Sequence, residues 1–127
     1  MTRIERLRRL RAVMDAKSVL EMARLSGIKA NVEAQRAREA ARLIARQTEN
    51  NAARLADTLN PTHAAWLALD TKTGLAQQRA IADARVPLED QKAQTAIAVG
   101  QSFVVDKMLD MERQANRTRR RKKSEER

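Results

Sequence analysis

A short break in the middle of the chain constrains the fold more than any other feature of this sequence. The segment 58–62, Thr-Leu-Asn-Pro-Thr, separates two long stretches rich in Ala, Arg, Glu and Gln, which are good helix formers. Proline disfavours the α conformation in the residue before it, whereas Asn is a favoured N-cap and Pro a favoured first helical residue. The sequence therefore predicts two long helices that fold back at a turn near Leu59-Pro61.

The composition indicates what kind of helical protein this is. One Trp, one Phe and no Tyr among 127 residues leave few large side chains for a globular core, whereas a coiled coil needs only a seam. We predict an all-α fold, an antiparallel coiled-coil hairpin over residues 1–116 with arms of about 3–58 and 61–116. Residues 117–127 form a basic tail that we expect to be disordered, because a block of like charges disfavours order.

Apolar residues at helical spacing mark the expected seam of each arm. The stripe of the first arm runs through Ile4, Leu7, Leu10, Met14, either Leu20 or Glu21, Leu25, Ile28 and Val32. The heptad-like stripe of the second arm runs through Ile97, Val104, Met108 and Met111. With a turn centred on residue 60, facing residues have numbers that sum to roughly 120, so that small residues meet in the middle of the arms. These are Ala37 and Ala41 opposite Ala84 and Ala80.

Two local signals refine the arms. Thr2 and Glu5 have the spacing of a capping box, which predicts a helix that begins directly after Thr2. Pro87 lies inside the second arm, where it removes a backbone hydrogen bond and clashes with the preceding turn. We expect a kink near Pro87, or a short interruption with a restart.

The residues that usually carry catalysis or bind metals are scarce. The chain has no cysteine, one histidine (His63) and three scattered glycines, so thiolate metal sites and glycine-rich phosphate loops are excluded. The acidic residues lie beside Lys or Arg at helical spacing, which is typical of a solvated face. We expect no catalytic residue, no metal and no cofactor.

The sequence gives no sign of membrane insertion. No stretch approaches the run of about 20 apolar residues that a membrane span needs. The arginines near the N-terminus are not followed by the apolar core of a secretion signal. We expect a cytoplasmic protein.

The net charge of +10 is concentrated near the two ends of the sequence. Residues 1–11 carry +4 and residues 112–127 carry +5, whereas the hundred residues between them carry +1. A hairpin brings these ends together into one surface for an acidic partner. The candidate partner-binding residues are Arg3, Arg6, Arg8, Arg9, Arg11, Arg117, Arg119, Arg120, Arg121, Lys122 and Lys123. Nucleic acid is one such partner, although no aromatic residue lies among these cations to stack on bases.

This layout resembles the FliJ family, the small coiled-coil proteins of the bacterial flagellar export apparatus, and their injectisome counterparts. The resemblance rests on a short cysteine-free chain, arms 3–58 and 61–116 with a break at Asn60-Pro61, the Arg-rich segment 3–11 and the Arg/Lys-rich tail. It covers most of the chain but includes no diagnostic motif, and Pro87 departs from the smooth helix of the family.

The resemblance implies a non-enzymatic stalk or adaptor. Family members resemble the central shaft of rotary ATPases, dock on the export ATPase ring, contact the export-gate membrane protein and handle export chaperones. By position, residues 3–14 and 108–121 would lie in or near the ATPase ring. The partners would hold the protein at the inner face of the membrane. The alternative is a basic coiled coil that binds nucleic acid or ribosomes nonspecifically. A third reading is a homo-oligomeric scaffold that uses the open side of the seam.

Overall fold

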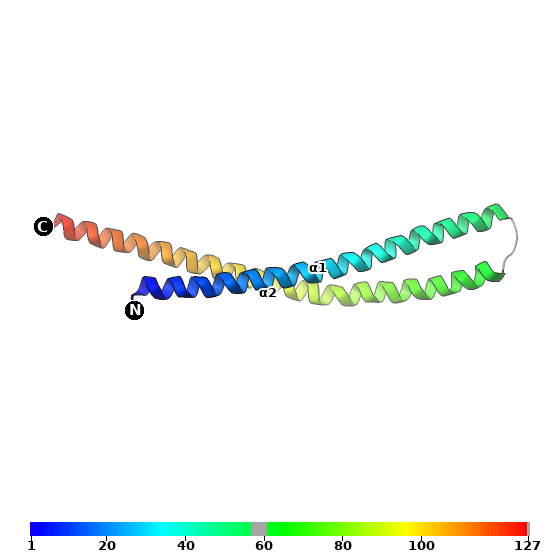
Figure 1. The fold of residues 1–127 in the computed structure, drawn as a ribbon, viewed down its shortest axis with the longest axis horizontal. Helices are drawn as coiled ribbons and strands as arrows, with labels where there is room; N and C mark the ends of the chain where they lie inside the picture. The colour runs from blue at the N-terminus through cyan, green and yellow to red at the C-terminus, as the bar shows by residue number, and fades with distance from the viewer. Residues whose placement is uncertain (57–60, 127) are drawn as a thin grey trace. The chain divides into compact units, whose positions relative to one another are not determined.

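The computed structural model describes residues 1–56 and 61–126, and every regular element within them is an α-helix. Helix α1 spans Arg3–Ala56 and helix α2 spans Pro61–Glu125. The two helices pack against each other as a helical hairpin, which confirms the predicted all-α fold (Figure 1). The predicted turn near Leu59-Pro61 lies outside the described residues, apart from Pro61, which begins α2 as expected.

The chain divides into two compact units. Unit 1 joins Met1–Leu25 to Gln91–Arg127, and unit 2 consists of Ser26–Asp90. Unit 1 thus pairs the first turns of α1 with the last turns of α2. None of the helices, over the residues described, is long and apolar enough to cross a bilayer.

The predicted capping box at the start of α1 is confirmed. The backbone N–H of Glu5 donates to the Thr2 hydroxyl at 3.2 Å, and the backbone N–H of Thr2 donates to the Glu5 carboxylate at 3.1 Å. These bonds satisfy two backbone donors that a helix N-terminus leaves without partners. The cap fixes where the first arginines of α1 begin.

The seam of unit 1 follows alternating steps of three and four residues, as in a coiled coil. The inward positions are Leu7, Met14, Ser18, Glu21 and Leu25 of α1, and Gln91, Thr95, Ala98, Ser102, Val105 and Leu109 of α2. The register is set by cross-helix hydrogen bonds from the Ser102 hydroxyl to Asp15 and from Lys17 Nζ to Gln101. Facing residues therefore have numbers that sum to 117 or 118 here, close to the expected 120.

The predicted seam of the second arm is wrong by one residue. Ile97 and Val104 are 59% and 54% exposed, and Met108 and Met111 are exposed as well. The buried residues are Ala98, Val105 and Leu109. One residue rotates the helix face by about 100°, so the strongest apolar stripe of α2 lies outside the seam.

A polar cluster takes the place of apolar contacts in the seam of unit 1. Of the two alternatives for α1, Glu21 is buried and Leu20 is exposed. The Gln91 amide donates to the Glu21 carboxylate and to the Glu21 carbonyl, and the Thr95 hydroxyl donates to the same carbonyl at 3.2 Å. Arg24 pairs with Glu21 at 3.0 Å. The buried carboxylate is therefore fully partnered, as a buried charge must be.

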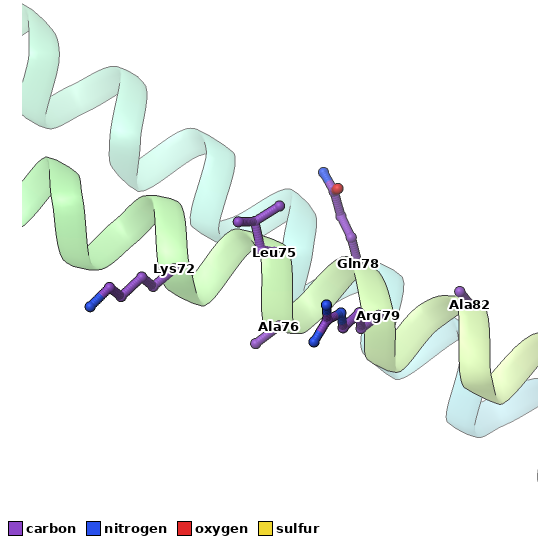
Figure 2. A pocket seen from close by; sticks show the side chains of 6 residues that line it. All are labelled: Lys72, Leu75, Ala76, Gln78, Arg79 and Ala82. Atoms are coloured by element: carbon purple, nitrogen blue, oxygen red, sulfur yellow. The ribbon is translucent and has the colours of Figure 1, made fainter.

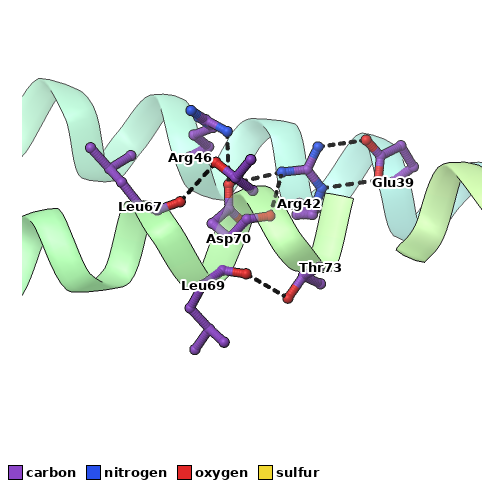
Figure 3. Close-up of polar contacts among 8 residues, drawn as sticks. Glu39, Arg42, Arg46, Leu67, Leu69, Asp70 and Thr73 are labelled. Atoms are coloured by element: carbon purple, nitrogen blue, oxygen red, sulfur yellow. Dashed lines mark hydrogen bonds and ion pairs between the residues drawn. The ribbon is translucent and has the colours of Figure 1, made fainter. Parts of the chain in front are cut away.

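Unit 2 has a second polar cluster, centred on Arg42 (Figure 3). Arg42 donates from Nε and Nη2 to the two carboxylate oxygens of Glu39 at 2.9 and 2.6 Å. Its Nη1 donates across the seam to Asp70 of α2 at 2.8 Å, and Arg46 reaches the same oxygen at 3.4 Å. The Asp70 side chain is only 8% exposed. A slip of one helix along the other would leave this carboxylate without Arg42, so the ion pair favours one register in unit 2.

The expected small-residue seam of unit 2 is also wrong. Ala37 and Ala41 are exposed, and Ala80 and Ala84 are half-buried. The long side chains of Glu39 and Arg42 fill the space instead, because Gly74 leaves room for the guanidinium beside α2. Val32, which is 1% exposed, supplies the apolar contact of this unit together with Leu88.

Helix α2 is longer and more regular than the sequence suggested. It is continuous at Pro87, so the alternative of a short interruption with a restart is wrong. The kink near Pro87 stays a prediction. It also continues to Glu125, so residues 117–125 are helical where we expected a disordered tail. Arg and Lys are good helix formers, and cations are favourable near a helix C-terminus. The ion pair from Arg121 to Glu125, at 3.7 Å, adds local support.

We predict that the two glycines Gly27 and Gly74 respond oppositely to alanine. A Cβ at Gly74 would lie 2.7 Å from the Arg42 guanidinium, whereas one at Gly27 meets nothing within 4 Å. Gly27→Ala should raise the free energy of unfolding by about 0.5–1 kcal/mol, the usual gain in a helix interior. Gly74→Ala should leave it unchanged or lower it, because Arg42 must move away from Asp70. Urea unfolding followed by far-UV circular dichroism measures both.

The control is the Gly74→Ala substitution in a variant that lacks the Arg42 side chain. In an Arg42→Ala background, Gly74→Ala should stabilise as much as Gly27→Ala does. Equal stabilisation by the two alanines in the unaltered chain would show that Arg42 does not pack on Gly74.

A second prediction concerns acid. Hydrogen bonds from Arg42 lower the pKa of Glu39, so ionised Glu39 stabilises the fold above its ordinary pKa of about 4.3. This contribution is lost as the pH falls through the lower value of the folded state. We expect the unaltered protein to have a higher unfolding temperature than Glu39→Gln at about pH 7, and this difference to shrink at about pH 3. A difference that stayed constant over this range would mean that Glu39 is not bonded to Arg42 as a carboxylate.

Candidate docking surface at the basic end

All eleven cations that the sequence singled out lie in unit 1 and are exposed. Five come from the first three turns of α1 and six from the last turns of α2. All residues of unit 1 together carry a net charge of +9, and all residues of unit 2 carry +1. Packing of α1 on α2 within unit 1 therefore gathers almost all of the excess positive charge.

Four of these cations line one groove where the first turn of α1 meets α2. The groove is lined by Arg3 and Arg8 of α1, by Arg119 and Arg120 of α2, and by Thr2, Ile4, Glu5, Glu112 and Asn116. These cations come from positions more than 110 residues apart in the sequence. The predicted meeting of the two basic segments is thus present in the structure.

Glu112 organises this groove. Its side chain is 14% exposed. It forms one ion pair with Arg3 at 3.5 Å and another with Arg119 at 3.8 Å. Arg119 also donates to the Asn116 side-chain oxygen at 3.0 Å. One carboxylate therefore holds two arginines of different helices close together, which would otherwise repel each other.

Two of the eleven candidates are held by other acids. Arg11 lies 2.7 Å from Asp106 of α2 and 3.7 Å from Asp15. Arg121 pairs with Glu125 of its own helix. These pairs are exposed and contribute little to stability, but they reduce the positive charge that Arg11 and Arg121 offer to a partner.

The other cations carry no ion pair within the part of the chain that the structure describes. They are Arg6, Arg8, Arg9, Arg117, Arg120, Lys122 and Lys123. The last turns of α2 extend past the beginning of α1 (Figure 1), and the residues that line the groove end at Arg120. The basic surface thus consists of a two-helix groove and a cationic helical extension.

The surface is suited to binding an acidic partner. Exposed cations attract an acidic partner over about 8 Å at physiological salt, and arginine forks pair well with carboxylates and phosphates. Within residues 1–56 and 61–126, no three His, Cys, Asp or Glu side chains come together as a metal site. The only acids in the groove are Glu5, which caps the helix, and Glu112, which is already paired.

A hollow on α2 in unit 2 has different character (Figure 2). It is lined by Lys72, Leu75, Ala76, Gln78, Arg79 and Ala82. All six residues come from one helix, and none of them is acidic. This hollow is an open surface of the helix and is a weaker candidate site than the groove of unit 1.

Two features of the docking surface escaped the sequence analysis. Glu112 was counted only as charge, although its position opposite Arg3 follows once the register of the seam is known. The row of exposed apolar residues on α2 was assigned to the seam. Both depend on the register between α1 and α2, which the cross-helix hydrogen bonds define.

Comparison with known proteins adds no family assignment: no protein-family model, no curated protein and no solved structure matches this chain.

We predict that Arg8 and Asn116, which line the same groove, can be joined within one chain. The protein has no cysteine of its own, so Arg8→Cys with Asn116→Cys gives a single reactive pair. A short bifunctional maleimide should link most of the chains internally at low protein concentration. Electrophoresis and mass spectrometry measure the internally linked monomer.

The matched control is Arg8→Cys with Lys123→Cys, since Lys123 lies beyond the groove. This pair should link in only a small fraction of chains. Equal linking of both pairs would contradict the groove, and no linking of the first pair would show that the two helix ends do not meet there.

Proposed function

We propose that this protein is a non-enzymatic coiled-coil adaptor of the flagellar type III export apparatus, and that the basic end of unit 1 docks on the export ATPase. The observation that carries the proposal is the groove in which Arg3 and Arg8 meet Arg119 and Arg120. Two distant basic segments combine into one surface that could recognise an acidic face of a protein ring.

The architecture supports an adaptor in three ways. The chain is a helical hairpin, as in the FliJ family that its sequence layout resembles. Its charge is concentrated in one unit, which orients the molecule toward an acidic partner. Its surface offers grooves and exposed side chains for protein contacts. The wider role that follows from the resemblance includes contacts with the export-gate membrane protein and with export chaperones, in the cytoplasm at the inner face of the membrane.

A second candidate function is nonspecific binding to nucleic acid or ribosomes. It is favoured by the helical extension, where Lys122 and Lys123 carry no ion pair within the described residues. Phosphate contacts made by such a helix would be strongly salt-dependent and independent of sequence. The absence of aromatic side chains among these cations argues against stacking on bases.

The deciding experiment compares two variants that lose the same charge. The first carries Arg3→Gln, Arg8→Gln, Arg119→Gln and Arg120→Gln, which empties the groove of cations. The second carries Arg36→Gln, Arg38→Gln, Arg54→Gln and Arg79→Gln, four exposed arginines of unit 2. Binding to the export ATPase of the same genome, and stimulation of its ATP hydrolysis, are measured with nuclease-treated proteins.

We expect the groove variant to lose about tenfold or more in affinity and to stop stimulating the ATPase, while the unit 2 variant stays within about twofold of the unaltered protein. Equal loss in both variants would mean that only net charge matters, and no binding by the unaltered protein would remove the proposal. A salt-sensitive shift of labelled RNA by the unaltered protein, lost on deleting residues 117–127, would support the alternative instead.

A further inference from the structure

Unit 1 carries an apolar face that the hairpin leaves uncovered. It is formed by Leu10, Val13 and Leu20 of α1 and by Ile97, Val104, Met108 and Met111 of α2, all of them exposed by 40% or more. We call these seven residues the cation-rimmed face. A monomer that exposes so many large apolar side chains on one side commonly binds something there.

The two helices contribute to the same side of the seam. Lys17 of α1 donates to Gln101 of α2 at 3.3 Å, which places both residues on this side. Leu10, Val13 and Leu20 lie seven, four and three residues from Lys17, and Ile97, Val104 and Met108 lie four, three and seven residues from Gln101. Met111 lies three residues beyond Met108 and continues the same row. Between the helices lies a groove of about 510 Å³, lined by Met14, Ile97, Gly100, Gln101, Val104 and Val105.

The shape of this face fits a third helix. Steps of three and four residues along both helices form the ridges and holes into which another helix packs. Gly100 contributes no side chain, and a Cβ built there meets nothing within 4 Å, so a partner can approach closely. Met14, Met108 and Met111 are unbranched and adapt to the shape of a partner.

The charges around the face are of one sign. Its borders carry Arg6, Arg9, Lys17, Arg24 and Lys107, at helical spacing from the apolar residues. Glu21 is buried in the seam, and Asp15 and Asp106 pair with Arg11 on the opposite side. A partner that matches these borders is therefore acidic.

We propose that the cation-rimmed face binds an amphipathic helix whose apolar stripe is flanked by acidic side chains. A second copy of this chain would bring its own cations against the same borders, and like charges across an interface are unfavourable. An anionic membrane would also meet apolar and basic groups, but the face has no aromatic residue and is grooved, which suits a helix better. The inference does not depend on what binds in the groove of Arg3, Arg8, Arg119 and Arg120, because that groove and the cation-rimmed face share no residue.

The test uses a synthetic helix as the probe. It is a fluorescein-labelled peptide of about four heptads, with Leu at the a and d positions and Glu at e and g, whose own charges oppose self-association. A second peptide has Lys in place of every Glu. Fluorescence anisotropy measures the binding of each peptide to the full chain.

Two triple variants, with equal numbers of apolar residues replaced and no change in charge, separate this face from the rest of unit 1. The face variant carries Val13→Gln, Ile97→Gln and Val104→Gln, and the matched control carries Val19→Gln, Val99→Gln and Phe103→Gln. All six residues are exposed in unit 1, and glutamine keeps the helix propensity. Circular dichroism verifies that both variants remain helical.

We expect the acidic peptide to bind the unaltered chain, the face variant to weaken this binding about tenfold or more, and the control to stay within about twofold. The basic peptide should bind at least about tenfold more weakly. The variant with four groove arginines replaced should retain most of its binding to the acidic peptide. The peptide experiment therefore tests the cation-rimmed face separately from docking on the ATPase.

Several outcomes would overturn the proposal. These are no binding of the acidic peptide, equal weakening by both triple variants, or equal binding of the two peptides. Analytical ultracentrifugation that shows a dimer of the unaltered chain, dissociated by the face variant alone, would assign the face to a second copy. Sedimentation with anionic phosphatidylserine vesicles that the face variant alone abolishes would assign it to a membrane.

Discussion

Buried polar side chains need partners, and in this hairpin many of the partners come from the opposite helix. The Gln91 amide donates to the Glu21 carboxylate, and the Asp70 carboxylate pairs with Arg42 and Arg46. Such bonds add little net stability compared with apolar packing, but breaking one leaves a polar group in the seam without its partner, which is unfavourable. The polar seam therefore selects one register for each unit, since any slip separates these groups.

A polar seam has a consequence for the surface. Val32 and Leu109 are the largest side chains that are fully buried among the described residues, while most of the other large apolar side chains lie outside. Fully burying one such side chain is worth about 1.5–3 kcal/mol. The apolar groups that this hairpin leaves in water are thus available to stabilise a complex. In unit 1, seven of them form the cation-rimmed face.

The two surfaces of unit 1 follow from one arrangement of helices. The register that pairs Arg3 with Glu112 also sets Lys17 opposite Gln101. The first pairing builds the cationic groove at the helix ends, and the second defines the side on which the apolar residues lie. A partner complex could use both surfaces, with charge guiding the approach and apolar contact retaining the bound helix.

The sequence alone determined the helices, the capping box, the midpoint break and the concentration of charge, because helix propensity, capping and net charge are local properties. It did not determine which face of each helix points inward. Ile97, Val104 and Met111 are more apolar than Ala98 and Thr95, yet the latter are buried. Only the pairing of Glu21 with Gln91 and of Arg42 with Asp70, between residues far apart in the chain, decided that rotation. The tertiary structure therefore placed polar groups in the seam and apolar groups on the surface.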